Sequence, residues 1–220
     1  MTRALQFKRK AAKSGRAKSL MVFLHGYGAD GADLLGLADP LAPYLPDTVF
    51  VAPDAADPCK NNPFGFQWFG IPWMDGTPEE EMVAGIHRAV EDINAFLDER
   101  LAAEGLGPEA LAVFGFSQGA MMALHIAPRR PAAFAAVVAC SGRLMAPELL
   151  KAEARVFPPV LLMHGDRDPV VPFESMEEAE QELGLAGFDV FSHVMKGTPH
   201  GIAPDGLSVT MQFLRERLPK

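Results

Sequence analysis

Short apolar runs alternate with longer, partly polar segments along most of the chain. Each run has the length of a strand that is buried on both faces. The runs lie at residues 20–24, 110–114, 135–139, 159–163 and 188–195. Strands that alternate with helical segments are typical of a mostly parallel sheet with helices on both faces. We therefore expect an α/β fold, organised as a single domain over residues 1–220.

The clearest helical pattern follows Thr77. Pro78 would occupy the first helical position and Glu80 the third, which is the arrangement of a capping box. Apolar residues then recur at helical spacing at Met82, Ile86, Val90, Ile93 and Leu97. We expect the helix to begin at Thr77 and its apolar stripe to pack into the core, not to bind a ligand.

Basic residues are concentrated before the first acidic residue, Asp30. They are Arg3, Lys8, Arg9, Lys10, Lys13, Arg16 and Lys18. Such a cluster could be a basic arm for a membrane surface. The spacing around Ser14-Gly15 instead favours an exposed antiparallel hairpin whose lysines protect a sheet edge from pairing with other chains.

Composition narrows the classes of function. The chain has 220 residues, of which 49% are hydrophobic, enough for a globular core. Its net charge of −8 argues against a nucleic-acid partner. No apolar run approaches the roughly 20 residues of a membrane span, and no segment resembles a signal peptide. We expect a cytoplasmic protein without stable membrane insertion.

Cysteine and histidine spacing gives no sign of a bound metal. Cys59 and Cys140 lie far apart without a disulfide framework, and neither residue type shows metal-ligand spacing. We expect no disulfide, no metal and no cofactor.

The most informative motif is Gly115-Phe-Ser-Gln-Gly119, between an apolar run and a helix-forming stretch. A strand, a tight turn and a helix in this order form a nucleophile elbow, in which the central serine is held at strained backbone angles. Alone, the motif is also compatible with an ordinary turn. Ser117 is the candidate nucleophile.

A serine nucleophile needs a base, and the base needs an acid that orients it. In this class of fold the order along the chain is serine, acid, histidine. The loop after residues 159–163 carries two acids, Asp166 and Asp168, and His200 lies in a glycine- and proline-rich loop after the last predicted strand. His200 is therefore the candidate base, and both aspartates remain candidate acids.

Four strings together resemble the phospholipase/carboxylesterase family of α/β-hydrolases, which includes acyl-protein thioesterases. They are Phe23-Leu-His-Gly-Tyr-Gly28, Gly115-Phe-Ser-Gln-Gly-Ala120, His164-Gly-Asp-Arg-Asp-Pro-Val-Val-Pro172 and Pro199-His-Gly201. The resemblance implies that Asp168 is the acid. It also implies an oxyanion hole formed by the backbone N–H groups of Tyr27 and Gln118. Leucine is common at the position of Tyr27 in the thioesterase branch.

The other histidines are expected to have structural roles. We expect His25 to hydrogen-bond its own loop, and the remaining four to support the fold. These four are His87, His125, His164 and His193.

A second motif points to a different class of function. Gly26-Tyr-Gly-Ala-Asp-Gly31 satisfies the dinucleotide-binding pattern after a strand and before a helix. Asp30 and Asp33, however, would place carboxylates where a pyrophosphate should bind. A dinucleotide site is therefore disfavoured.

Two features bear on the substrate. The long loop before Thr77 is rich in aromatic residues, and we expect Trp68 and Phe69 to form an apolar wall for an acyl chain; alternatively, these side chains only fix the loop to the body. Residues 141–159 leave room for a short helix but no large lid domain.

We therefore expect a carboxylesterase that cleaves esters of short to medium acyl chains through an acyl-enzyme. The alternatives are an acyl-protein thioesterase or lysophospholipase, and a non-catalytic binding protein on the same scaffold. The expected partner is a small-molecule ester or thioester, and a homodimer is an open alternative.

Overall fold

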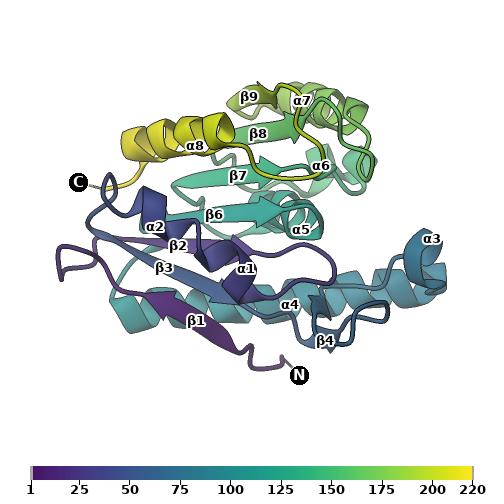
Figure 1. Ribbon diagram of the computed structural model, residues 1–220, viewed down its shortest axis with the longest axis horizontal. Helices are drawn as coiled ribbons and strands as arrows, with labels where there is room; N and C mark the ends of the chain where they lie inside the picture. The colour runs from purple at the N-terminus through teal and green to yellow at the C-terminus, as the bar shows by residue number, and fades with distance from the viewer. Residues whose placement is uncertain (1, 220) are drawn as a thin grey trace.

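A seven-stranded sheet forms the centre of the computed structural model, which describes residues 2–219 (Figure 1). Its strands are β1 (Phe7–Lys10), β2 (Ser19–Leu24), β3 (Thr48–Pro53), β6 (Leu111–Phe116), β7 (Ala136–Cys140), β8 (Val160–Gly165) and β9 (Val190–Met195). The spatial order is β1-β3-β2-β6-β7-β8-β9, and only the pairing of β1 with β3 is antiparallel. The expected α/β class with a mostly parallel sheet is confirmed.

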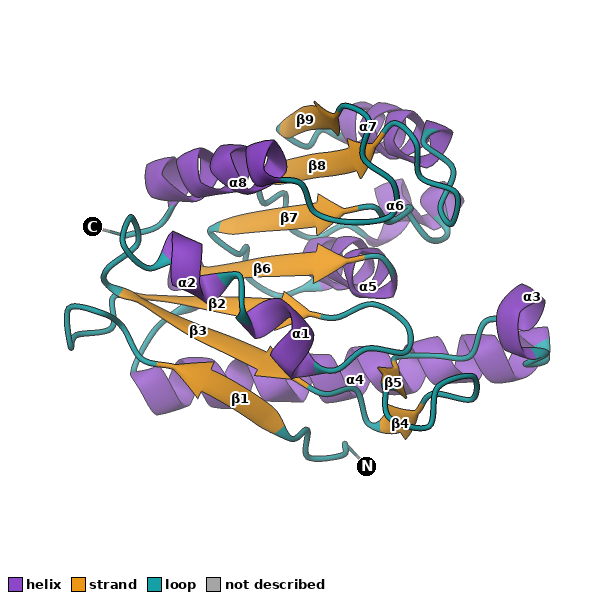
Figure 2. Cartoon of the chain, viewed as in Figure 1, coloured by secondary structure: helices purple, strands orange, loops and turns teal. Residues whose placement is uncertain are grey.

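Helices cover both faces of this sheet (Figure 2). They are α1 (Gly31–Leu35), α2 (Ala38–Leu41), α3 (Pro72–Asp75), α4 (Glu79–Glu104), α5 (Gln118–Ile126), α6 (Pro147–Glu153), α7 (Glu174–Ala186) and α8 (Pro204–Arg217). In the view of Figure 2, α1, α2 and α8 lie in front of the sheet, and α4 to α7 lie behind it. A two-stranded hairpin, β4 (Asp57–Pro58) with β5 (Phe66–Gln67), projects from the loop before α3.

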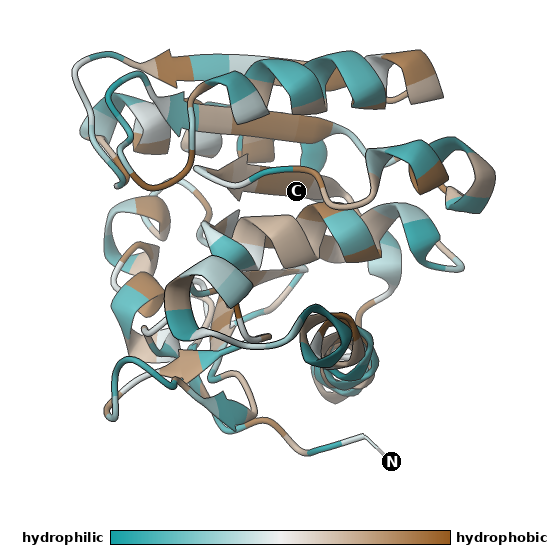
Figure 3. Cartoon of the chain, turned by 90° about the vertical axis from the view of Figure 1, so that its right-hand side faces the viewer, coloured by the Kyte–Doolittle hydropathy of each residue, from teal (hydrophilic) through white to brown (hydrophobic). Residues whose placement is uncertain are grey.

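The core consists of one apolar layer on each face of the sheet. Neighbouring residues of a strand point to opposite faces. On β2, Leu20 and Val22 belong to the layer that also contains apolar residues of α4 and α5, whereas Met21 and Phe23 belong to the layer beneath α1, α2 and α8. Figure 3 shows this sandwich from the side, with brown, apolar strand segments between helices of mixed colour.

The N-terminal segment departs from the expected hairpin. β1 pairs with β3 and not with β2, its successor in the chain, because the connection through residues 11–18 is long enough to pass over β3. β1 remains a basic edge strand, since Lys8, Arg9 and Lys10 all belong to it.

The long helix α4 also starts differently from the expectation. It begins at Glu79, and no side-chain hydrogen bond caps its first turn. The hydroxyl of Thr77 accepts a hydrogen bond from Lys60 Nζ at 2.7 Å, and this side chain is buried. Thr77 therefore anchors the preceding loop, so the predicted capping box is wrong.

The six parallel strands direct their carboxyl ends to one edge of the sheet, on the right in Figure 1. The loops that follow β2, β6, β8 and β9 therefore meet there, where ligands bind in open α/β sheets. Residues 141–159 contain only the short helix α6, as expected. Within residues 2–219, no helix combines the length and apolarity needed to cross a membrane.

Candidate active site

Ser117 occupies a strained turn between β6 and α5. Its backbone angles are φ 53° and ψ −116°, a region that residues with a side chain rarely adopt. The Ser117 amide donates a hydrogen bond to the carbonyl oxygen of Cys140 on the neighbouring strand at 2.8 Å. The serine is 9% exposed. The surrounding structure thus holds it in a conformation that it would not adopt alone.

The glycines on either side of the serine make this turn sterically feasible. A Cβ atom on Gly115 would lie 2.3 Å from the carbonyl oxygen of Gly119. A Cβ atom on Gly119 would lie 1.9 Å from the carbonyl oxygen of Leu24 on β2. Both distances are shorter than any real contact, so only glycine lets β6, α5 and β2 approach this closely.

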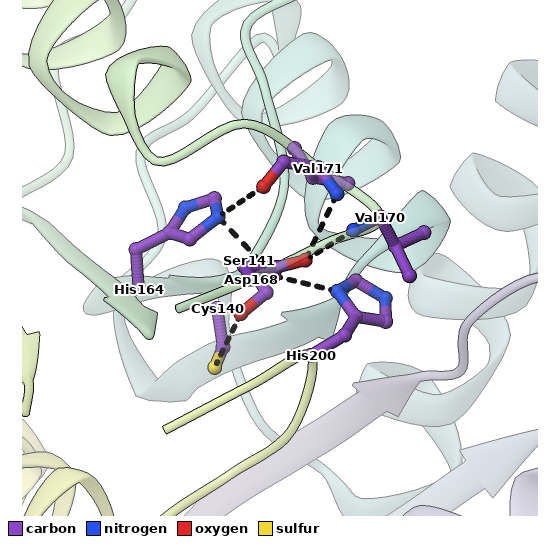
Figure 4. A network of polar contacts seen from close by, with 7 residues as sticks. All are labelled: Cys140, Ser141, His164, Asp168, Val170, Val171 and His200. Atoms are coloured by element: carbon purple, nitrogen blue, oxygen red, sulfur yellow. Dashed lines mark hydrogen bonds and ion pairs between the residues drawn. The ribbon is translucent and has the colours of Figure 1, made fainter. Parts of the chain in front are cut away.

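Asp168 and His200 lie in the loops after β8 and β9 and contact each other (Figure 4). Asp168 Oδ2 is 2.7 Å from His200 Nδ1, and Oδ1 accepts hydrogen bonds from the amides of Val170 and Val171 at 2.8 and 2.9 Å. The carboxylate is fully buried. Burial alone would raise its pKa, but the hydrogen bonds from His200 and the two amides outweigh it, so the pKa of Asp168 is lowered. The acid therefore stays ionised and can orient the imidazole.

The second candidate acid, Asp166, takes a different place. It is exposed, and its Oδ1 accepts a hydrogen bond from the amide of Gly197 at 2.6 Å. That contact ties the loop after β8 to the loop after β9. The structure places Asp168, and not Asp166, against His200.

His164 was expected to have only a structural role, but it also contacts Asp168. Its Nε2 lies 3.0 Å from the carbonyl oxygen of Val171 and 3.3 Å from Asp168 Oδ2. Because a carbonyl oxygen can only accept, Nε2 carries the hydrogen. Burial lowers the pKa of His164, which favours the neutral ring. Only its place at the end of a predicted strand, four residues before Asp168, could have indicated this contact.

His200, the candidate base, lies beside the elbow. The ring of His200 is 4.9 Å, centroid to centroid, from the ring of Phe116, the residue before Ser117. Since β6, β7, β8 and β9 are successive neighbours in the sheet, the loops that carry Ser117, Asp168 and His200 share one edge. Asp168 and His200 are thus in contact, and His200 packs against the residue that precedes Ser117.

The two predicted oxyanion donors are free. Among residues 2–219, neither the Tyr27 amide nor the Gln118 amide donates a hydrogen bond to another protein group. The loop that carries Tyr27 lies against the nucleophile, because a Cβ atom on Gly26 would be 3.3 Å from Ser117 Cβ. Gln118 directly follows the serine. One amide next to Ser117 in the chain and one in the adjacent loop are therefore without a hydrogen-bond partner among the described residues.

The Gln118 side chain fixes the aromatic loop. Its Nε2 donates to the carbonyl oxygen of Phe69 at 2.7 Å, and its Oε1 accepts from the Trp68 amide at 2.8 Å. The indole of Trp68 donates to the carbonyl oxygen of His25 at 2.9 Å and is 2% exposed. Trp68 is packed into the core, as in the alternative that these side chains fix the loop to the body.

Phe69 lines a cavity of about 630 Å³ next to the elbow. Ser117 and His200 do not line this cavity. Met121 does, and the Met121 amide donates a hydrogen bond to the carbonyl oxygen of Ser117 at 3.1 Å. The cavity therefore begins one helical turn from the nucleophile. Met82 and Ile86 of α4 also line it, so the first part of that apolar stripe is not purely core, contrary to the expectation.

His25 and the glycine pattern after β2 have structural explanations. His25 Nε2 accepts from the Ala55 amide at 3.0 Å, so its Nδ1 donates to the carbonyl oxygen of Gly26 at 2.7 Å, within its own loop. At the start of α1, the Gly31 amide donates to Asp54, and the Asp33 amide donates to Asp30. These carboxylates occupy the donors that a pyrophosphate would need.

Comparisons with known proteins agree with this architecture. Residues 8–218 match the family model described as phospholipase/carboxylesterase. The chain is 45% identical to a protein of known structure titled esterase PE8, with a TM-score of 0.92 and coverage of 98% of this chain and 100% of that one. It is 28% identical to esterase YpfH of Escherichia coli over 93% of this chain and 85% of the relative. It is 30% identical to acyl-protein thioesterase 1 of Kluyveromyces lactis over 96% of each chain. The chain belongs to the phospholipase/carboxylesterase family of α/β-hydrolases.

Proposed function

We propose that this protein is a serine carboxylesterase that cleaves esters of short to medium acyl chains. The observation that carries the proposal is the 2.7 Å contact between His200 and a buried, ionised Asp168, at the same sheet edge as a serine in a strained elbow. A histidine oriented by a carboxylate is the base that a serine nucleophile requires. Membership of the family supports the same activity.

In the proposed mechanism, Ser117 attacks the ester carbonyl while His200 Nε2 accepts the hydroxyl proton. Asp168 holds the ring through Nδ1 and stabilises the imidazolium that forms. The amides of Tyr27 and Gln118 bind the negative charge that develops on the carbonyl oxygen. His200 then returns the proton to the leaving alcohol, and an acyl-enzyme remains. A water molecule, deprotonated by His200, repeats the attack and releases the carboxylic acid.

The cavity beside Met121 is the proposed site for the acyl chain. Phe69 and Ile86 contribute apolar surface to it, whereas Trp73, at its rim, is largely exposed. The lining also includes polar side chains, among them His125 and Arg143. A partly apolar cavity with an exposed rim suits a chain whose far end stays attached to a larger partner.

That exposed rim and the thioesterase relatives favour a second candidate function. A thioesterase would use the same serine, base and amides on a thioester, since both reactions pass through an acyl-enzyme. Acyl-protein thioesterase 1 of Kluyveromyces lactis is similar over nearly the whole chain. A lysophospholipase would share this chemistry as well.

We further propose a cytoplasmic location. Cys59 and Cys140 are both buried and unpaired, as is usual in a reducing compartment. A homodimer stays a prediction, for which sedimentation of the purified protein is the test.

The test of function is hydrolysis of p-nitrophenyl esters from acetate to palmitate by the wild type and by Ser117→Ala. We expect the wild type to cleave the short and medium esters and the variant to lose about 10⁶ in kcat, because the nucleophile is gone. The variant should remain folded, which circular dichroism checks. A Ser117→Ala protein that retained most of the rate would refute the assignment of the nucleophile.

Labelling separates the remaining alternatives. A fluorophosphonate should modify Ser117 in the wild type and leave Ser117→Ala unmodified. Labelling without ester turnover, combined with cleavage of a palmitoyl thioester, would favour the thioesterase. No labelling and no turnover would favour a non-catalytic binding protein.

A further inference from the structure

The oxyanion loop is held by a side-chain contact outside the catalytic groups. The hydroxyl of Tyr27 donates a hydrogen bond to Asp75 Oδ2 at 2.8 Å. Asp75 is the last residue of α3, 48 positions further along the chain. The contact therefore joins the loop after β2 to the wall of the cavity, because Ile71 and Trp73, at the start of α3 and within it, both line that cavity.

The backbone around Tyr27 depends on contacts with other residues to fix its direction. Gly26 and Gly28 flank it, and Gly28 has a positive φ of 79°. Glycines allow many peptide orientations. The next peptide is anchored, since the Gly28 amide donates to the carbonyl oxygen of Phe66 at 2.8 Å. The Tyr27 amide itself makes no such bond, but the carbonyl oxygen of the same planar peptide, that of Gly26, accepts from His25 Nδ1 at 2.7 Å and from the Ala29 amide at 3.2 Å. The contact of the Tyr27 hydroxyl with Asp75 restrains this residue from the side-chain direction as well.

Asp75 is a rigid anchor for that side chain. Its Oδ2 also accepts from the Ile71 amide at 3.1 Å, and its Oδ1 accepts from the Thr77 amide at 2.8 Å. Burial alone would raise its pKa, but the hydrogen bonds from Thr77, Ile71 and Tyr27 lower it to about 2. Burial, Cys59 and Asp75 raise the pKa of Tyr27. At neutral pH a protonated hydroxyl thus faces a carboxylate, which is a strong, charge-assisted pair.

We propose that Asp75 is a positioning residue for the oxyanion hole, which it holds in place through the hydroxyl of Tyr27. The proposal rests on the proposed function, because it assigns the Tyr27 amide to the developing oxyanion. It adds that the wall of the acyl cavity and the oxyanion donor are mechanically one unit. A pocket for the acyl chain and a donor for its carbonyl oxygen would then keep a constant relative position.

The test is a double-mutant cycle of Tyr27→Phe and Asp75→Ala, with kcat and KM measured on p-nitrophenyl butyrate and octanoate. Each single variant should lose about tenfold in kcat at nearly unchanged KM, less than the 10²–10³ lost when an oxyanion donor is removed outright. The double variant should be no slower than either single one, because all three lack the same hydrogen bond. Asp75→Asn keeps an acceptor oxygen and should recover part of kcat.

The control is Tyr44→Phe, the same change at the only other tyrosine of the chain, which is 55% exposed. Its kcat should equal that of the wild type. Rates are expressed per fluorophosphonate-reactive site, so that loss of folded protein does not count as loss of kcat. If Asp75→Ala does not fold, Tyr27→Phe still tests the positioning role, because it keeps the ring and removes only the hydroxyl.

The outcomes separate the two proposals. Variants that unfold more easily but keep their kcat would show a purely structural contact and overturn the positioning role. Additive losses in the double variant would overturn it as well. A wild type that cleaves neither ester nor thioester would refute the hydrolase function, and the role of Asp75 with it.

Discussion

Four hydrogen-bond donors surround the carboxylate of Asp168. His200 and His164 face Oδ2, and the amides of Val170 and Val171 face Oδ1. A buried carboxylate with this many donors is held in one orientation, and the donors favour its ionised form. Asp168 Oδ2 is therefore a rigid acceptor, and its hydrogen bond with Nδ1 fixes the orientation of the His200 ring.

Replacing this acceptor should distinguish the two neighbouring aspartates. Asp168→Asn would turn an N–H₂ group toward at least one donor and favour the wrong tautomer of His200, so we expect kcat to fall by up to about 10⁴. Asp166→Asn keeps an oxygen for the Gly197 amide and should stay within a few-fold of the wild type. Ester hydrolysis by both variants measures this ranking, and the reverse order would move the acid to Asp166.

For individual residues, sequence was most informative where a motif dictates backbone geometry. The strings around Ser117, Asp168 and His200 predicted which loops meet, because each follows a recognisable strand. The roles of Trp68, His164 and the Tyr27 hydroxyl could not be predicted, since each depends on a partner distant in the chain or on burial in the folded state. An aromatic residue in a loop has the same sequence signature whether it lines a pocket or fills the core.

At the scale of elements, the elbow is the junction of β6, α5 and β2. Its two glycines let the three backbones approach within distances that exclude a side chain. The strain at Ser117 is maintained by this junction and not by the serine itself.

The pair Gly119→Ala and Gly184→Ala tests this junction. Gly119→Ala would place a methyl group 1.9 Å from the carbonyl oxygen of Leu24, so we expect a large loss of stability or no folded protein. Gly184 lies inside α7 with open space around its Cα, and Gly184→Ala should raise the free energy of unfolding by about 0.5–1 kcal/mol. Urea unfolding compares the two variants; equal stability would contradict this account of the elbow.

Apolar periodicity predicted which segments are strands and which are helices. It did not predict which strands pair or where each element begins. The run of basic residues correctly indicated an edge strand. That β3 lies between β1 and β2 depends on a long-range pairing with no local signature. The start of α4 was misplaced because the Thr77 hydroxyl bonds Lys60 of the preceding loop and makes no hydrogen bond to the first turn of the helix.

For the whole molecule, two buried histidines, His25 and His164, and the half-buried His125 link stability to pH. Burial lowers the pKa of His25, His125 and His164, and that of His125 falls to about 4. A histidine with a lower pKa in the folded state binds fewer protons there than in the unfolded chain. Its contribution to stability is therefore complete above the unfolded value of 6.5 and is lost as the pH falls through the folded value.

We expect the free energy of unfolding to decrease from pH 7 to pH 5, before most carboxylates titrate, and to decrease further at pH 4. His125→Leu should flatten this dependence, because the helix then has no imidazole to protonate when it unfolds. Urea unfolding at pH 7, 6, 5 and 4 provides the measurement. If the free energy of unfolding depended on pH as steeply in His125→Leu as in the wild type, His125 would not be a source of the dependence.

Because the strands are mostly parallel, the proposed catalytic groups lie at one end of the molecule and not at the other. All the proposed catalytic groups follow the carboxyl ends of strands, whereas the 11–18 connection, at the left in Figure 1, lies at the opposite edge. An immobilisation tether placed in the exposed turn at Ser14-Gly15 would hold the protein on a solid support with its catalytic face turned toward the solution. Lys13 already offers an amine there for such a linkage.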